Sequence, residues 1–256
     1  MEDKVKILVA APIFDGMKYC IDKFVDRIKS LDYEDYDILL VDNSKTNLFY
    51  EEVKKKHDVD VMYLSLDVPN MEKIIRSRNY ILDYAVDESY DYILMMDCDV
   101  IPPANILSKL LSHEKEIVSG LYFGLFGPTG KQKNDTVAWK IASDKEVAEI
   151  NLRFPEFIKK HGIPRRHLTE EEVKSGELQE VIIPSAGCML LSREVFKKIR
   201  YGLLDVSGYE TSDDIFFCQK AREAGFKLYC DPSIKCEHLI FGKFKEDGND
   251  LVHPAY

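Results

Sequence analysis

Two carboxylates that flank a single residue offer the clearest chemistry in this chain. Asp97 and Asp99 follow the apolar run 92–96, which is typical of a buried strand. In an extended backbone, residues two apart point to the same side, so both carboxylates could hold one magnesium or manganese ion. The pair could instead cap a following helix, because aspartate favours helix N-termini. Asp-x-Asp is too short a pattern to decide between these interpretations.

Arg78 is predicted to lie on the apolar face of a helix, four residues after Ile74 and four before Leu82. A buried guanidinium keeps its charge and therefore needs an anionic partner. That partner could be a carboxylate of the core, such as Asp97, or the phosphate of a ligand. The sequence leaves both interpretations open.

Three further polar residues could take part in a reaction. Asp213 and Asp214 fall in the predicted first turn of a helix, where interaction with the helix dipole is the simpler explanation. One of them could also be a general base, because a helix N-terminus stabilises the anionic form of a carboxyl group. His238 follows a predicted strand and is either an ordinary polar residue or a third manganese ligand beside two carboxylates.

The elements that must position these residues alternate along the first hundred residues. We expect the first strand to end at Pro12. Strands that alternate with amphipathic helices predict an α/β, Rossmann-like fold with a mostly parallel sheet, helices on both faces and ligands at the carboxyl ends of the strands. Apolar residues at the spacing of strands and helices predict, in order, strand 5–11, helix 17–31, strand 37–42, strand 59–64, helix 71–85 and strand 92–96.

The second half of the chain is less regular. Residues 124–180 are polar, contain Trp139 and are interpreted either as an insertion or lid that faces a second substrate, or as a surface excursion without a role. The tail 241–256, with His253, could fold over a bound ligand. The elements predicted around this region are helix 105–113, strand 116–123, one strand over 181–191, a helix from 211–214 to 224 and strand 227–231.

The composition argues against several classes of function. The 256 residues carry a net charge of −10, so binding to nucleic acid is not expected. No apolar run approaches the roughly 18 residues of a membrane span. The six cysteines form no Cys-x-x-Cys pair, and the N-terminus has no signal-peptide pattern. We therefore expect reduced thiols, a cytoplasmic location and no transmembrane segment.

Seven short segments, in this order, resemble those of the family 2-like glycosyltransferases with a GT-A fold, which use nucleotide-sugars. The resemblance covers most of the chain outside 124–180, and each segment is weak when taken alone. The matching segments are Ala10-Ala11-Pro12, Val41-Asp42-Asn43-Ser44, Arg76-Ser77-Arg78-Asn79, Asp97-Cys98-Asp99, 185–190 with Arg193-Glu194-Val195-Phe196, Ser212-Asp213-Asp214, and 221–226 with Cys236-Glu237-His238.

The resemblance implies a donor-binding site in the half formed by residues 1–103. Pro12 and Asp42 would line the nucleoside pocket, and Arg78 would support the nucleotide and the aspartates of the metal site. Asn43 stands where the family commonly has a second aspartate, so the resemblance does not carry over a nucleotide preference.

The resemblance also implies a metal site and a catalytic base. Asp97 would face the ribose and the metal, Asp99 would bind the metal directly, and His238 would complete the metal site. Asp214 matches the catalytic base of inverting members. Asp213 replaces the usual glutamate beside it, which leaves open which of the two carboxylates is the base.

The function that this resemblance implies is a hexosyltransferase-type glycosyltransferase that depends on manganese or magnesium. It would move a sugar from a UDP- or GDP-sugar to a hydroxyl of a carbohydrate, lipid-linked or small-molecule acceptor, bound by residues 104–256 of one continuous domain. A retaining glycosyltransferase and a non-catalytic nucleotide- or carbohydrate-binding module are the alternatives. A sugar-phosphate nucleotidyltransferase is disfavoured, because 10–16 lacks a glycine-rich loop with basic residues. No oligomeric state is predicted.

Overall fold

Strands and helices alternate through the first half of the structure, as the spacing of apolar residues predicts. The computed structural model describes residues 5–127, 131–156, 158–159, 164–203, 205–206, 209–210 and 212–239, so the predictions for Thr211 and for the tail 241–256 with His253 lie outside it. The elements of this half are β1 (Ile7–Ile13), the 3-10 helix η1 (Asp15–Met17), α1 (Ile21–Ile28), β2 (Tyr36–Asp42), α2 (Leu48–Lys56), β3 (Asp60–Tyr63), α3 (Asn70–Asp87) and β4 (Tyr92–Met96).

The second half adds strands to the same sheet and contains several short elements. Among the described residues, no helix combines the length and apolar composition needed to cross a membrane. The elements of this half are β5 (Val100–Ile101), α4 (Ile106–Leu111), β6 (Ile117–Leu121), β7 (Phe123–Phe126), β8 (Lys133–Thr136), β9 (Trp139–Ile141), α5 (Asp144–Arg153), β10 (Arg165–His167), α7 (Glu170–Ser175), β11 (Gln179–Val181), β12 (Cys188–Ser192), α8 (Arg193–Lys198), β13 (Asp205–Val206), β14 (Tyr209–Glu210), α9 (Asp213–Glu223), β15 (Leu228–Lys235) and β16 (Glu237–His238).

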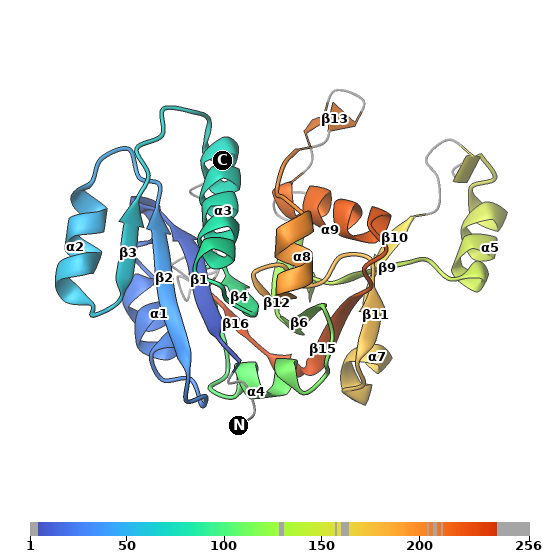
Figure 1. The fold of residues 1–256 in the computed structure, drawn as a ribbon. Helices are drawn as coiled ribbons and strands as arrows, with labels where there is room; N and C mark the ends of the chain where they lie inside the picture. The colour runs from blue at the N-terminus through green and yellow to red at the C-terminus, as the bar shows by residue number, and fades with distance from the viewer. Residues whose placement is uncertain are drawn as a thin grey trace.

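Eight strands form the central sheet in the order β11-β15-β6-β12-β4-β1-β2-β3 (Figure 1). β12 is antiparallel to its neighbours β4 and β6, and the edge strand β11 is antiparallel to β15. The other neighbouring strands are parallel to one another. The predicted α/β fold with a mostly parallel sheet is confirmed. Strands from 1–103 and from 104–256 lie in one sheet, while the different roles of these two halves stay a prediction.

Helices cover both faces of the sheet, because successive strand residues point to opposite sides. In β1, Ile7 and Val9 belong to the core cluster that also contains residues of α1, α2 and α4, whereas Leu8 and Ala10 belong to the cluster with residues of α3, α8 and α9. All four of these residues are fully buried. Strands that are apolar on both faces are typical of a parallel sheet covered by helices. This two-sided core fixes the strand ends that carry the candidate site.

The structure corrects the prediction that the first strand ends at Pro12. β1 continues to Ile13 and pairs with β2 along its whole length. β4 pairs with β1 only as far as Ala10. On that side no described strand pairs with Pro12, so the missing N–H of the proline costs no ladder hydrogen bond there.

The single strand predicted over 181–191 is also wrong, because this stretch contributes to two strands. β11 ends at Val181 on the edge of the sheet, and β12 begins at Cys188 in its centre. Between them, the Cys188 N–H donates to the carbonyl oxygen of Ser185 in a turn. Pro184, which cannot donate to a ladder, lies in this connection. The helix α2 was not predicted, and it buries only Phe49 and Val53.

We expect Leu94→Ala to lower the free energy of unfolding by about 2–5 kcal/mol, because it leaves a cavity in a packed interior. Leu94 is fully buried in β4, beside Val9 of β1 and Leu190 of β12. Denaturant unfolding measures the change. Leu152→Ala is the control, because Leu152 is 86% exposed on α5 and should change stability by no more than about 0.5 kcal/mol. Equal losses in the two variants would contradict the assigned core.

Candidate active site

One buried guanidinium joins two aspartates that are far apart in the chain. Arg78 of α3 donates from Nη2 to Oδ1 of Asp97 at 2.6 Å and from Nη1 to Oδ2 of Asp213 at 2.7 Å. Its side chain is only 6% exposed. The sequence left open an internal carboxylate partner or a ligand phosphate, and the structure contains the internal pair with Asp97. The second partner, Asp213 at the start of α9, was not predicted.

The charges in this bridge do not cancel, because two carboxylates share one cation. Burial alone would lower the pKa of Arg78, but Asp213 and Asp97 outweigh it and raise that pKa well above its ordinary value. Burial raises the pKa of both aspartates, and Arg78 opposes this without reversing it. The Nε of Arg78 is also buried and has no hydrogen-bond partner among the described residues. Arg78 therefore stabilises both carboxylates, but one guanidinium cannot neutralise two of them, so the bridge keeps excess negative charge.

Gly187 leaves the space in which Asp97 sits. The Asp97 N–H donates to the Gly187 carbonyl oxygen at 2.9 Å, and the Gly187 N–H donates to Oη of Tyr122 at 3.2 Å. A Cβ atom on residue 187 would lie 2.8 Å from Oδ2 of Asp97 and 2.9 Å from Oη of Tyr122. Any larger residue would displace one of these groups, which explains the glycine in this turn.

Asp99 and His238 lie together, although they are 139 positions apart in the sequence. β16 pairs with β5, which places His238 opposite Val100, and the Leu239 N–H donates to the Asp99 carbonyl oxygen at 2.7 Å. Nε2 of His238 lies 3.6 Å from Oδ2 of Asp99. Nδ1 lies 2.8 Å from the carbonyl oxygen of Phe123, which can only accept, so Nδ1 carries a proton.

Two of the three predicted metal ligands fit a divalent cation. Asp99 and His238 face each other with an oxygen and a nitrogen, and the carbonyl of Phe123 orients the imidazole as carbonyls commonly orient ligating histidines. Asp97 directs Oδ1 to Arg78 instead. Among the described residues, no group of three or more His, Cys, Asp or Glu side chains is arranged to hold a metal. A cation at this pair would need further oxygen ligands from outside the protein.

Asp214 differs from its neighbour Asp213 in its partners. Oδ1 of Asp214 accepts hydrogen bonds from the Ser212 hydroxyl and, at 2.8 Å, from the Ile215 N–H. Among the described residues, none donates a hydrogen bond to its other oxygen and none forms an ion pair with Asp214. Asp213 is 6% exposed and is held by Arg78. Of the two carboxylates that the sequence left open as bases, Asp214 is therefore the one that is not held by Arg78.

The predicted nucleoside-side residues lie at the ends of β1 and β2. Asp42 is fully buried, and its Oδ1 accepts from the Ser44 N–H at 2.9 Å and from the Ser44 hydroxyl at 2.5 Å. Burial raises the pKa of Asp42, and Ser44 opposes the shift. In the part of the chain that the structure describes, Oδ2 of Asp42 has no hydrogen-bond partner. Asn43 donates to Oγ of Ser77 at 3.0 Å, so it ties this turn to α3. Contact of Asp42 and Pro12 with a nucleoside stays a prediction.

Tyr122 is a site residue that the sequence did not indicate. Its ring meets the His238 ring edge-on with centroids 4.9 Å apart, and its Oη accepts the hydrogen bond from Gly187. Burial, with Asp97 nearby, raises the pKa of Tyr122 well above its ordinary value. Tyr122 thus contacts both the metal pair and the turn that holds Asp97. Its position directly after β6 carries no local signal of this role.

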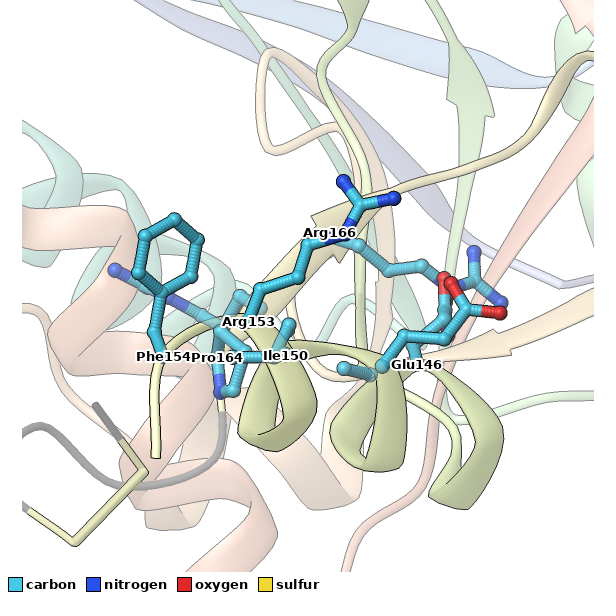
Figure 2. Close-up of a pocket in the computed structure, with 9 residues that line it drawn as sticks. Glu146, Ile150, Arg153, Phe154, Pro164 and Arg166 are labelled. Carbon is cyan, nitrogen blue, oxygen red and sulfur yellow. Dashed lines mark hydrogen bonds and ion pairs between the residues drawn. The ribbon is translucent and has the colours of Figure 1, made fainter. Parts of the chain in front are cut away.

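A separate open pocket of about 310 Å³ lies between α5 and β10 (Figure 2). Phe154, Pro164 and Ile150 give it an apolar wall, and Arg166 is paired with Glu146 on its other side. All of its lining residues come from 142–166. This pocket is therefore not part of the Arg78 bridge.

Comparisons with known proteins identify the family of the chain. A model of the family described as "Glycosyl transferase family 2" matches residues 12–200, which excludes Asp213, Asp214 and His238. No curated protein sequence matches the chain. A crystal structure of GalNAc-T7 with UDP, GalNAc and Mn²⁺ is similar at a TM-score of 0.61 and 14% identity, over 93% of this chain and 44% of that one.

Structures of Staphylococcus aureus TarS are similar as well. The TarS structure matches at a TM-score of 0.52 and 15% identity, over 89% of this chain and 35% of that one. TarS 1–349 in complex with UDP-GlcNAc matches at a TM-score of 0.52 and 12% identity, over 91% of this chain and 58% of that one. The chain spans less than half the length of the GalNAc-T7 and full TarS chains, and 58% of TarS 1–349. At such low identities, the likeness shows the shared GT-A fold alone.

We expect Arg78→Met to lower the free energy of unfolding by about 3–5 kcal/mol, because it leaves Asp97 and Asp213 without their shared cation. Thermal or denaturant unfolding measures the loss. Arg76→Met, two residues away on the same helix, removes only an exposed pair with Glu72 and should cost less than about 1 kcal/mol. If both variants unfold at the same denaturant concentration, the bridge does not stabilise the fold.

Proposed function

The chain belongs to glycosyl transferase family 2, and we propose that it is an inverting, metal-assisted member that moves a sugar from a UDP- or GDP-sugar to an acceptor hydroxyl. The bridge at Arg78 carries this proposal. By holding Asp97 and Asp213 on one guanidinium, it brings the 97–99 turn next to the start of α9. In the proposed arrangement, the Asp99–His238 pair and Asp214 would flank the same point.

The proposed donor is a nucleotide-diphosphate sugar. This is supported by the fold shared with GalNAc-T7, whose structure contains UDP and Mn²⁺, and with TarS, whose structure contains UDP-GlcNAc. Pro12 and Asp42 would shape the nucleoside pocket at the ends of β1 and β2. Asp97 would face the ribose with Oδ2, the oxygen that Arg78 does not bind; its side chain is 33% exposed.

The proposed metal ligands are Asp99 and His238, with Asp97 close by. A manganese or magnesium ion at this pair would stabilise, as a Lewis acid, the negative charge on the released diphosphate. The protein's own contribution is orientation: the Phe123 carbonyl holds Nδ1 of His238 so that Nε2 faces Asp99. Tyr122 packs against the same ring and limits its rotation.

The proposed base is Asp214. A carboxylate within hydrogen-bond reach of the acceptor hydroxyl can take its proton as the new glycosidic bond forms. Ser212 and the Ile215 N–H fix one oxygen of Asp214, and the other, which no described residue holds, would take this proton. Asp213 is committed to Arg78 and would instead position the start of α9. A base on the acceptor side is what an inverting reaction requires, and the anomer of the product tests this point.

We expect Asp214→Asn to lower kcat by about 10²- to 10⁴-fold, while the affinity for UDP stays unchanged, because asparagine keeps the acceptor oxygen for Ser212 and Ile215 but cannot take a proton. Steady-state kinetics and calorimetry measure the two quantities. Asp213→Asn is the comparison: it should chiefly lower the melting temperature, because it weakens the bridge to Arg78. Full turnover by purified Asp214→Asn would remove Asp214 from the reaction.

We expect Asp99→Asn to abolish the gain in UDP affinity that manganese gives the wild-type protein, because it removes a charged ligand from the pair with His238. Titration calorimetry with and without MnCl₂ measures this gain. Glu237→Gln is the matched control, because Glu237 adjoins His238 but forms an exposed pair with Lys23. A manganese effect of the same size in Asp99→Asn and in the wild type would refute the assignment.

A further inference from the structure

A small two-stranded sheet in the region 124–180 has two chemically different faces. β9 and β10 pair antiparallel, with Trp139 opposite His167, Lys140 opposite Arg166 and Ile141 opposite Arg165. Because strand side chains alternate, Lys140 and Arg166 share one face, and the other two pairs share the opposite face. Figure 1 shows β9 and β10 at the β11 end of the molecule, away from α1 and α2.

The face of Lys140 and Arg166 is closed by ion pairs. Lys140 lies 2.9 Å from Glu172, and Arg166 lies 2.7 Å from the same carboxylate. Arg166 also pairs with Glu146 at 3.0 Å. The hydrogen bonds from Arg166, with help from Thr169 and Lys140, lower the pKa of Glu172 to about 2. The charged groups of the Lys140–Arg166 face therefore pair with one another, which leaves this face few groups that could bind a ligand.

The opposite face is aromatic and partly open. The rings of Trp139 and His167 have centroids 5.1 Å apart, and the ring of Phe126, at the end of β7, lies 5.4 Å and 4.6 Å from them. All three residues are partly exposed, and the adjoining Ile141 is 49% exposed. We call Phe126, Trp139 and His167 the aromatic face. Aromatic rings kept at the surface with a polar edge are typical of binding sites.

His167 gives the aromatic face a hydrogen-bonding group. Its Nδ1 lies 2.6 Å from the carbonyl oxygen of Thr136, so Nδ1 carries the proton. Among the described residues, none makes a hydrogen bond to its Nε2. This nitrogen is therefore an acceptor at the edge of three rings. A sugar matches the combination, because one side of a pyranose presents C–H groups to an aromatic ring while its rim presents hydroxyls.

The aromatic face is tied to the proposed reaction centre through one β-ribbon. Thr136, which holds His167, is the direct partner of Phe123 in the β7–β8 pair, and the Phe123 carbonyl holds His238. Directly paired residues lie roughly 5 Å apart, and each imidazole is one hydrogen bond further out, so the rings lie on the order of 10–15 Å apart. An acceptor of a few sugar units can span that length.

We propose that the aromatic face is an acceptor subsite that stacks a sugar ring, and that the acceptor is therefore an oligosaccharide chain. This rests on the proposed transfer reaction, which supplies the need for an acceptor hydroxyl near Asp214. A lipid would instead require a larger and more apolar groove than three rings bordered by charged residues. The sugar unit stacked on Trp139 would be several units away from the acceptor hydroxyl that reacts. The aromatic face therefore selects acceptors by length and does not touch the reacting atoms.

The chain contains one tryptophan, so its fluorescence reports directly on this face. We expect a saturable change in emission when trisaccharides of glucose, N-acetylglucosamine, mannose and galactose are titrated one by one into the UDP- and manganese-loaded protein. At least one trisaccharide should give the change, and glycerol should give none. This measurement uses the unaltered protein. If no trisaccharide changes the emission, the assignment of a sugar to the aromatic face is wrong.

Substitution then tests the ring itself. Trp139→Ala should weaken retention on the immobilised form of the responding trisaccharide by about tenfold, because stacking on an indole is lost. Phe154→Ala is the control, because Phe154 is an aromatic residue of the same region that is 63% exposed and lies outside the aromatic face. Equal retention by Trp139→Ala and the wild type would overturn the proposal.

A separate readout distinguishes this proposal from the transfer reaction. The slow hydrolysis of a nucleotide-sugar by the manganese-loaded protein needs no acceptor, so Trp139→Ala should keep the wild-type rate. If the wild type binds a trisaccharide but hydrolyses and transfers from no UDP- or GDP-sugar, the proposed function fails while the aromatic face stands as a sugar site. A loss of hydrolysis in Trp139→Ala would mean that Trp139 acts on the donor, which overturns its place in an acceptor subsite.

Discussion

The candidate site depends on two carboxylates sharing one guanidinium in a buried position. Arg78 reaches Asp97 at the end of β4 and Asp213 at the start of α9, and the same two segments carry Asp99 and Asp214. Burying charge is costly unless it is paired, so the chain has one favourable way to bring these segments together. The excess negative charge that remains favours a cation nearby, which agrees with a metal-assisted reaction.

The local parts of this arrangement could be predicted from the sequence. An apolar run followed by Asp97 and Asp99 indicated a buried strand with carboxylates at its end, and the position of Arg78 on an apolar face indicated an anionic partner. The partner Asp213 could not be predicted in this way, because it lies 135 residues further along the chain. Periodicity describes neighbours along an element, whereas that contact depends on how α3 and α9 pack on the same face of the sheet. Tyr122 was missed for the same reason.

The errors in the predicted elements have physical causes as well. Pro12 was expected to end β1, but a proline disturbs a strand only where its N–H would have met a partner, and β4 does not reach that far. The stretch 181–191 is apolar throughout, so its pattern could not reveal that the chain turns at 185–188 between an edge strand and a central one. The region 124–180 lacked a clear period because its strands are short and pair with one another.

The reversed strand β12 has a consequence for how the protein is made. It fills the position between β4 and β6, so β4 has backbone groups with no partner until residues Cys188–Ser192 have left the ribosome. A nascent chain that stops short of this point exposes an open, apolar sheet edge of the kind that joins other chains. An amino-terminal half without β12 would therefore leave this edge of β4 uncovered, which makes its synthesis the stage at which chaperones have the most to protect.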